Sequence, residues 1–346
     1  MICHRPEICT AGTRLGGMQK RELGRTHRNV SAIGLGTWQL GADWGSVDET
    51  DALAVLDAAY EAGVNFFDTA DVYGDGRSEQ LIGTWLKANP DAGVTVATKM
   101  GRRVEQLPEN YNLDAFRAWN DRSRKNLGVD TLDLVQLHCP PTPVYSTDAI
   151  YDALDTMVDE GRMANYGVSV ETVDEALAAI ARPNIATVQI IINAFRHKPL
   201  ETVLPAAREA GVGIIARVPL ASGLLTNRYT LQTEFAKDDH RNFNRDGSSF
   251  DVGETFSGVD YATGLQAAGE FAKLAAAEAP EATSAQVALA WLAAQDGVST
   301  IIPGARNAQQ ARANAAAGSL RISEGFNASV RDLYDAKLRE QIHPRW

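Results

Sequence analysis

The sequence contains little cysteine and no long hydrophobic run. Only three of its 346 residues are cysteines, and Cys3 and Cys9 lie far from Cys139, a pattern that fits neither a disulfide framework nor a metal site. No stretch approaches the roughly 18 consecutive apolar residues of a membrane span, and the start of the chain lacks the apolar core of a secretory signal. We therefore predict a cytoplasmic protein that binds neither a membrane nor a metal ion.

Basic residues are fewer than acidic ones, 33 lysines and arginines against 44 aspartates and glutamates. The formal net charge is -11 at pH 7, and there is no stripe of lysine and arginine that could follow a nucleic-acid backbone, so we expect no nucleic-acid partner. Hydrophobic residues make up 45% of the chain and charged residues 22%, which is typical of a globular protein with a substantial core. The length suits one large domain, and nothing in the sequence indicates an oligomeric state.

The first residues differ in character from the rest of the chain. Residues 1–17 lack hydrophobic periodicity and end in Gly16 and Gly17, directly before a second methionine, Met18. Our hypothesis is that this segment is an extension, non-native or disordered. Residues 18–346 are then expected to form a single domain.

Short apolar or β-branched runs alternate with longer segments of helical periodicity. The runs cover residues 30–35, 64–67, 94–98, 132–137, 164–168, 186–192, 212–216 and 298–302. Capping signals such as Thr172 with Glu175 open the helical segments, and glycines such as Gly128 and Gly211 end them. Eight successive strand and helix units predict parallel pairing, because each helix returns the chain to the same end of the sheet.

Eight such units can close into an α/β barrel, the (β/α)8 or TIM type, which is the fold we predict. The alternative is a doubly wound open sheet, which would carry a G-x-G-x-x-G turn after its first strand. Gly34, Gly36 and Gly41 do not have that spacing. Two segments exceed the repeating pattern: a long loop after the seventh strand at 221–260, and an extra C-terminal helix at 323–340. A loop of that length usually covers a functional site.

Polar side chains follow several of the predicted strands. The active site of such a barrel lies at the carboxyl ends of its strands. These ends carry Asp68, Lys99, His138, Ser169 and Gln189, and Tyr73 stands on the loop beyond the first of them. Each residue alone has an ordinary structural explanation, such as a turn residue or a core histidine. Their convergence on one rim predicts a functional site, because titratable groups with shifted pKa values cluster at such sites.

Four of these residues indicate proton transfer at a carbonyl group. The cation of Lys99 beside Tyr73 would favour the phenolate and so ease proton donation by the phenol. A buried lysine keeps its charge next to a carboxylate, which is the role expected of Asp68. His138 would hydrogen-bond the substrate oxygen and hold it against the phenol. The glycines after the tyrosine let the loop turn back over the barrel, and Ser78 is expected to cap the next helix.

The segments "FDTADVYGDGRSE", "VATKMG", "LDLVQLHCP", "GVSV" and "IIPGARNAQQARAN" resemble the aldo-keto reductase family in sequence and in order, from Met18 to about residue 320. The resemblance implies a barrel that binds a nicotinamide dinucleotide without a Rossmann fold. It places the family's catalytic tetrad on Asp68, Tyr73, Lys99 and His138, with the tyrosine as proton donor to a carbonyl that receives hydride from the cofactor. The implied activity is NADPH-dependent reduction of a small-molecule aldehyde or ketone.

The resemblance also implies the residues that bind the cofactor. They are Gly36, Thr37, Trp38, Asp68, Ser169, Gln189, Arg217, Pro219, Leu220, Gly223, Leu225, Arg228, Gly304, Arg306, Gln310 and Asn314. Ser169 and Gln189 match positions that hold the nicotinamide carboxamide. Arg306 matches the partner of an adenosine 2′-phosphate, which favours NADP over NAD. Two positions depart from the common pattern: Val170 stands where an asparagine or arginine is frequent, and Arg217 where many relatives stack an aromatic ring on the nicotinamide.

Two other functions are compatible with this pattern. One is an NAD(P)-linked dehydrogenase of a sugar or polyol, in which the phenolate of Tyr73 acts as base. The other is a cofactor-bound regulatory subunit similar to the β subunits of potassium channels, although those subunits replace the histidine that stands here as His138. The substrate pocket is expected to involve Trp38 and Trp44 beside Tyr73 and His138, with Tyr145 a further candidate.

Overall fold

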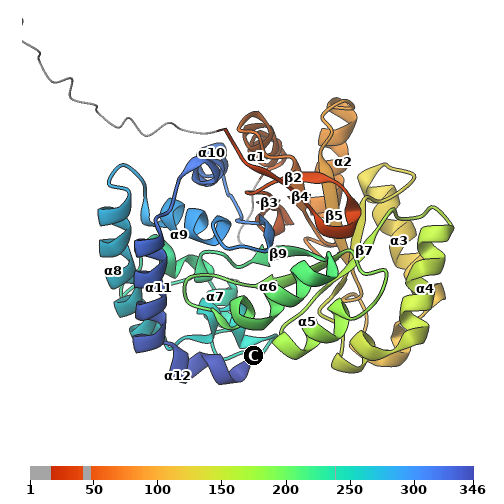
Figure 1. Cartoon of the computed structure of the whole chain (residues 1–346). Helices are drawn as coiled ribbons and strands as arrows, with labels where there is room; N and C mark the ends of the chain where they lie inside the picture. Colours follow the sequence, from red (N-terminus) through yellow and green to blue (C-terminus); the bar gives the residue numbers. More distant parts are fainter. Residues whose placement is uncertain (1–16, 42–47, 238) are drawn as a thin grey trace, which may run out of the picture.

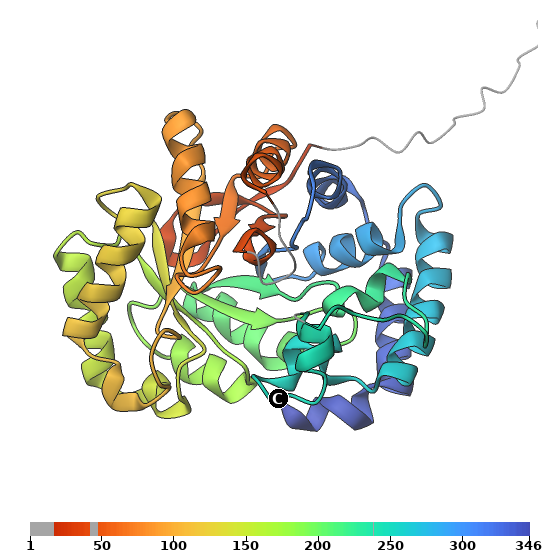
Figure 2. The same ribbon diagram turned by 180° about the vertical axis from the view of Figure 1, so that it is seen from behind.

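Eight parallel strands surround the axis of the molecule and helices cover them on the outside (Figure 1 and Figure 2). The computed structural model describes residues 17–41, 48–237 and 239–346. The strands are β3 (Leu35–Gly36), β4 (Phe66–Asp68), β5 (Thr95–Met100), β6 (Leu134–His138), β7 (Tyr166–Ser169), β8 (Thr187–Ile191), β9 (Gly213–Arg217) and β10 (Val298–Ile301). Their order in the sheet follows the chain. Parallel bridges from Ile33 to Ile301 and from Gly36 to Gly304 join the two edges, so the predicted (β/α)8 barrel is confirmed.

Helices follow each barrel strand along the chain. They are α1 (Glu49–Glu61), α2 (Arg77–Ala88), α3 (Leu113–Leu127), α4 (Asp148–Asp159), α5 (Val173–Ile180), α6 (Lys198–Ala210), α8 (Tyr261–Glu278), α9 (Ser284–Ala293) and α10 (Ala308–Ala316). The predicted capping box of Thr172 and Glu175 opens α5, and Gly128 and Gly211 end α3 and α6 with φ of 69° and 68°. Among the described residues, no helix has the length and apolar character that crossing a bilayer requires.

The first predicted strand is wrong in its extent. The run 30–35 is divided between β2 (Asn29–Ser31), which pairs antiparallel with β1 (Lys20–Glu22), and the barrel strand β3. The hairpin turns at His27, which has a φ of 53°. Its side chains Leu23 and Val30 pack against Phe66 and other residues inside the barrel. The apolar character of the run therefore reflects two different surroundings, the floor of the barrel and its wall.

The two segments beyond the repeating pattern are present, with one correction. Residues 221–260, which we call the lid segment, contain only short helical turns in their described part (221–237 and 239–260), including α7 (His240–Phe243). The predicted helix 323–340 is two helices, α11 (Glu324–Lys337) and α12 (Arg339–Ile342), because Leu338 leaves helical geometry at φ -123°. In Figure 1, α11 lies beside α8 on the outside of the barrel.

Candidate active site

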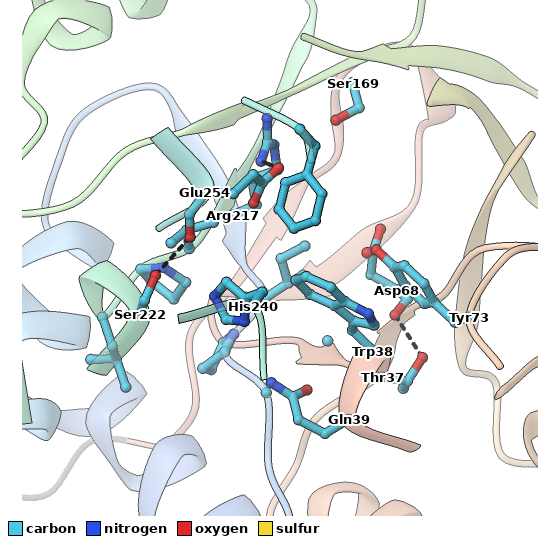
Figure 3. Close-up of a pocket in the computed structure, with 18 of the residues that line it drawn as sticks. Thr37, Trp38, Gln39, Asp68, Tyr73, Ser169, Arg217, Ser222, His240 and Glu254 are labelled. Atoms are coloured by element: carbon cyan, nitrogen blue, oxygen red, sulfur yellow. Dashed lines mark hydrogen bonds and ion pairs between the residues drawn. The ribbon is translucent and has the colours of Figure 1, made fainter. Parts of the chain in front are cut away.

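A cavity of about 630 Å³ opens at the carboxyl ends of the strands. Its walls come from the strand ends, the loops after β3 and β4, and the lid segment. Figure 3 shows Asp68 and Tyr73 on one side of this cavity, with Arg217 and Glu254 on another. The lid segment contributes several lining residues, which agrees with the expectation that it covers a site.

Lys99 lies at the centre of the polar cluster. Its Nζ forms a buried ion pair with Asp68 Oδ1, donates to the carbonyl oxygen of Thr69 at 2.9 Å, and lies 3.4 Å from the hydroxyl oxygen of Tyr73. The lysine and aspartate side chains are only 1% and 2% exposed. They stand on neighbouring strands, β5 and β4, whose pairing brings the three groups together.

Burial and charge act against each other in this cluster. Burial alone would lower the pKa of Lys99, but Asp68 and Tyr73 outweigh it and raise that pKa, so the ammonium form is stable. Burial raises the pKa of Tyr73, the Lys99 cation opposes this, and Asp68 adds to it. The net direction is upward. The lysine therefore does lower the pKa of the phenol as expected, but less than burial raises it, and the phenol keeps its proton at neutral pH.

His138 faces the tyrosine. The ring centroids of Tyr73 and His138 are 5.9 Å apart at an interplanar angle of 85°. Burial, with the cations of Arg102, Lys99 and Arg217, holds the pKa of His138 well below its usual value, so the ring is neutral. Its buried Nδ1 has no hydrogen-bond partner. A neutral imidazole can donate one N–H to an oxygen held beside the phenol.

Two amides bind the second oxygen of the aspartate. Gln189 Nε2 donates to Asp68 Oδ2 at 2.8 Å, and Gln136 Nε2 donates to the same atom at 3.3 Å. Gln136, on β6, is fully buried and also lies 3.4 Å from Gln189 through its Oε1. Gln136 was not among the residues predicted from the sequence, although its alternation with His138 along one strand places both side chains on the same face.

The prediction that Ser78 caps the next helix is wrong. Helix α2 begins at Arg77 after Gly76, whose φ of 94° a glycine adopts readily, so Ser78 is already inside the helix. Its Oγ donates to Thr37 Oγ1 at 2.8 Å and accepts from Thr69 Oγ at 2.8 Å. The serine thus ties the tyrosine loop to the loop after β3.

Most of the residues predicted to bind the cofactor line the cavity. They are Gly36, Thr37, Trp38, Asp68, Ser169, Gln189, Arg217, Pro219, Leu220, Gly223 and Gly304. Leu225 is buried in the helical turn Ala221–Thr226, and Arg228 and Arg306 are exposed and do not line the cavity. Gln310 and Asn314 lie on α10, where Asn314 Nδ2 donates to Gly304 O at 3.1 Å and Gln310 Oε1 accepts from the backbone N of Arg306 at 2.8 Å. Neither Gln310 nor Asn314 lines the cavity, but Asn314 contacts the lining residue Gly304 directly.

Arg217 has a partner that the sequence did not suggest. It forms a buried ion pair with Glu254 of the lid segment and donates to Val170 O at 2.9 Å. Burial alone would lower the pKa of Arg217, but Glu254 and its other anionic neighbours outweigh this and raise it. The sequence marked this position as a departure from relatives that stack an aromatic ring on the nicotinamide. In the structure it lines the cavity while being held by the lid.

The cavity has features that suit a dinucleotide. A Cβ on Gly36 would lie 2.8 Å from the carbonyl oxygen of Ile302, and one on Gly304 would lie 2.1 Å from the amide of Gln39, so the walls approach closely there. Gln39 lines the cavity, and its buried Oε1 has no hydrogen-bond partner. Glycine at these two positions lets a ligand approach the backbone closely, and the unpaired oxygen of Gln39 can accept a hydrogen bond. Both features suit a ligand rich in hydroxyl and amide groups.

The residues proposed for the substrate pocket have different positions. Trp38 lines the cavity, stacked on Tyr73 with ring centroids 6.0 Å apart at 19°. Trp44 lies outside the described residues. Tyr145 does not line the cavity: it is buried, and its hydroxyl donates to Ser169 O at 2.9 Å. Within the described part of the chain, no group of three or more histidine, cysteine, aspartate or glutamate side chains could hold a metal ion.

Comparison with known proteins agrees with this geometry. The family model described as the aldo/keto reductase family matches residues 32–335. The chain belongs to this family. Aldo/keto reductases are NADP(H)-dependent oxidoreductases that act on carbonyl and alcohol groups, and the chain is an enzyme of that class.

Three relatives illustrate the range of the aldo/keto reductases. An aldo-keto reductase of Strobilurus tenacellus is 33% identical over 88% of this chain and 89% of its own length. A probable voltage-gated potassium channel subunit beta of Oryza sativa is 30% identical over 85% of this chain and 89% of its own. The solved structure of a glycerol dehydrogenase from Gluconobacter oxydans is 26% identical, covers 95% of this chain and 98% of its own, and superimposes with a TM-score of 0.75.

Proposed function

We propose that the protein reduces an aldehyde or ketone to the alcohol with NADPH, and that Tyr73 supplies the proton. The observation that carries this proposal is the position of Lys99 Nζ between the carboxylate of Asp68 and the hydroxyl of Tyr73, in a cavity lined by His138. This arrangement keeps a protonated phenol beside a buried positive charge. A carbonyl oxygen that gains negative charge is the group such a site stabilises.

Each residue has a distinct part in the proposed reaction. A bound NADPH supplies the hydride to the carbonyl carbon. The hydroxyl of Tyr73 gives its proton to the carbonyl oxygen, and the Lys99 cation stabilises the phenolate that remains. Asp68 keeps the lysine charged in a buried site, since an unpaired buried ammonium would lose its proton. His138, held neutral, donates a hydrogen bond to the same oxygen and orients it.

The cavity offers groups for each part of the cofactor. Ser169 and Gln189 would hold the nicotinamide carboxamide, with the hydroxyl and the amide oxygen as acceptors. Pro219, Leu220 and Gly223 would cover the pyrophosphate, and Gly304 would let the backbone approach it. Arg306, beyond the end of the cavity, would pair with the 2′-phosphate.

Replacement of Tyr73 by phenylalanine tests the proposal. We expect Tyr73→Phe to lower kcat for NADPH oxidation by about 100-fold or more across a panel of aldehydes and ketones, because only the proton donor is lost. NADPH binding, measured by the change in nucleotide fluorescence, should stay within about twofold.

The matched control is Tyr60→Phe, which removes an exposed hydroxyl on α1 and should change neither property. A Tyr73→Phe variant that keeps its turnover would show that another group donates the proton.

The similarity to a glycerol dehydrogenase favours a second candidate, oxidation of an alcohol or sugar with NADP, in which deprotonated Tyr73 accepts the proton. Initial rates with polyols and aldoses plus NADP, compared with those of aldehydes plus NADPH, separate the two directions. The similarity to a channel subunit raises a third candidate, a regulatory protein that binds the cofactor. Tight NADPH binding without turnover on any carbonyl would support that function instead.

A further inference from the structure

Aromatic rings form a continuous wall on one side of the cavity. Trp38, stacked on Tyr73, lies 5.3 Å from His240 and 6.4 Å from Phe250, measured between ring centroids. Phe250 in turn lies 6.0 Å from Phe243. Figure 3 shows Trp38 between Tyr73 and His240. We call Trp38, His240, Phe250 and Phe243 the aromatic wall; all four line the cavity, and the last three belong to the lid segment.

The charged side chains that line the same cavity are already paired, and Arg241 contacts Asp239 Oδ2 at 2.5 Å through its Nη2. Arg102 Nη2 contacts Glu171 Oε1 at 3.0 Å, and its Nε donates to the backbone oxygen of His138 at 3.0 Å. Arg217 is paired with Glu254 of the lid. A charged group on a substrate would have to separate one of these pairs or remain unpaired in a buried site, and both are costly.

The histidines of the cavity do not supply charge either. Burial lowers the pKa of His240 to about 4, against the opposing effect of Asp239, so at neutral pH its ring is an uncharged flat surface. The neutral state of His138 has the same consequence. The surface next to the reactive phenol is therefore aromatic and close to neutral.

We propose that the preferred substrate is an uncharged aromatic carbonyl compound, with its ring against the aromatic wall and its carbonyl oxygen between Tyr73 and His138. This inference rests on the proposed reductase function. Aromatic pairs in edge or offset geometry gain free energy beyond the area they bury, whereas a saturated ring gains only the burial. A sugar would lose hydrogen bonds to water along this wall, and a keto acid or a phosphorylated carbonyl would meet no unpaired cation among the arginines named above.

The first experiment tests charge on the wild-type enzyme. The substrates are 4-carboxybenzaldehyde and methyl 4-formylbenzoate, which share the ring and the aldehyde but differ in one negative charge. We expect kcat/KM for the ester to exceed that for the carboxylate by about tenfold or more, mainly through KM, because the carboxylate lacks a partner. A carboxylate that is reduced as well as the ester would overturn the inference, since it would show that an arginine is available.

The second experiment tests the wall itself. The ratio of kcat/KM for benzaldehyde to that for cyclohexanecarboxaldehyde is measured in the wild type, in Phe250→Leu and in Phe235→Leu. Because intrinsic reactivity cancels between variants, the ratio should fall roughly two- to tenfold in Phe250→Leu. Phe235 lies in the same lid segment, packs on Tyr229 and Phe256, and does not line the cavity, so Phe235→Leu should keep the wild-type ratio.

The outcomes separate this inference from the function on which it rests. The enzyme could reduce all four aldehydes while Phe250→Leu leaves the ratio of kcat/KM for benzaldehyde to that for cyclohexanecarboxaldehyde unchanged. This result would overturn the aromatic preference and leave the reductase function standing. An equal fall of the ratio in Phe250→Leu and Phe235→Leu would also overturn it, because loosening of the lid would then be the cause. No NADPH oxidation with any of these aldehydes, or with aliphatic ones, would reject the function and the preference together. Quenching of tryptophan fluorescence by benzamide but not by cyclohexanecarboxamide provides support independent of turnover.

Discussion

Gln136 is connected to Tyr73 through Asp68 and Lys99. Its amide donates to Asp68 Oδ2 at 3.3 Å, opposite the oxygen that binds Lys99. The charge of Asp68 raises the pKa of Tyr73, and a donor on the carboxylate moderates that effect. A side chain that does not line the cavity can therefore influence the acidity of the proposed proton donor, Tyr73.

We expect Gln136→Met, which keeps the volume but removes the donor, to lower kcat about three- to tenfold. The pKa of Tyr73 should rise further, so the pH optimum of alcohol oxidation, which needs the phenolate, should move upward. Steady-state rates in both directions between pH 6 and 10 give these quantities. Gln295→Met, far from the cavity, is the control, and a variant with reduced kcat but an unshifted profile would indicate only a packing defect.

At the residue scale, the sequence predicted the groups that stand at strand ends and the contacts of Lys99 with Asp68 and Tyr73. It did not predict the bond from Gln136 to Asp68 or the partner of Arg217. Asp68, Lys99 and His138 follow apolar runs, and the barrel brings such positions to one rim whatever the details of packing. Glu254 could not be found in this way. It lies 37 residues beyond Arg217 in an irregular segment, where no periodicity fixes the direction of a side chain.

At the scale of elements, the lid segment is attached to the barrel through Glu254. Its side chain pairs with Arg217 at the end of β9, and its backbone oxygen accepts from Ser222 Oγ at 2.7 Å. The same hydroxyl oxygen accepts from the backbone N of Phe256 at 3.0 Å. The ion pair thus joins the lid segment to the barrel, as does the bond from Asn193 Nδ2 to Ser257 Oγ at 2.8 Å, whereas Ser222 fixes Glu254 within the lid segment.

Glu254→Gln should lower the free energy of unfolding by about 1–3 kcal/mol, because the buried Arg217 loses its countercharge. Cleavage by a protease within the lid segment should become several times faster. Glu270→Gln makes the same change in an exposed pair with Lys337 and should alter stability by less than about 0.5 kcal/mol. Urea unfolding and limited proteolysis measure both effects; equal behaviour of the two variants would show that the buried pair does not hold the lid.

Strands and helices that repeat were easier to predict than the places where the repeat is broken. Eight alternating units determine the barrel because parallel strands need a crossover each time. The prediction of a single strand at 30–35 was wrong because Val30 and Leu35 are both buried, but in different places. Val30 packs against the barrel interior and Leu35 lies within the barrel wall, and an apolar run in the sequence does not distinguish these two surroundings. The break at Leu338 between α11 and α12 carries no glycine or proline to mark it.

At the scale of the whole molecule, buried ionisable groups make stability depend on pH. His197 follows the end of β8 and stacks on Tyr334 of α11 and Trp291 of α9, with ring centroids 4.1 Å and 5.1 Å away. It is 4% exposed, and burial lowers its pKa to about 3. The folded protein therefore leaves this ring neutral down to about pH 3, whereas the unfolded chain protonates it near pH 6.5.

The sign of the effect follows from proton binding. Between about pH 6.5 and 3 the unfolded chain binds a proton at His197 that the folded protein does not, so the free energy of unfolding falls as the pH falls through this range. His197→Phe keeps a flat ring and removes this proton site. Relative to the wild type, the variant should gain about 2 kcal/mol between pH 7 and pH 5.

Urea unfolding at the two pH values measures the difference, and His27→Gln, which changes an exposed histidine, is the control. The buried acid Asp71, whose pKa burial raises to about 7, has the opposite slope in both proteins and cancels in the comparison. An unchanged difference between pH 7 and pH 5 in His197→Phe would mean that the ring is already protonated in the folded state. The contact between the barrel and α11 would then include a protonated His197, stabilised by cation–π interactions with the rings of Tyr334 and Trp291.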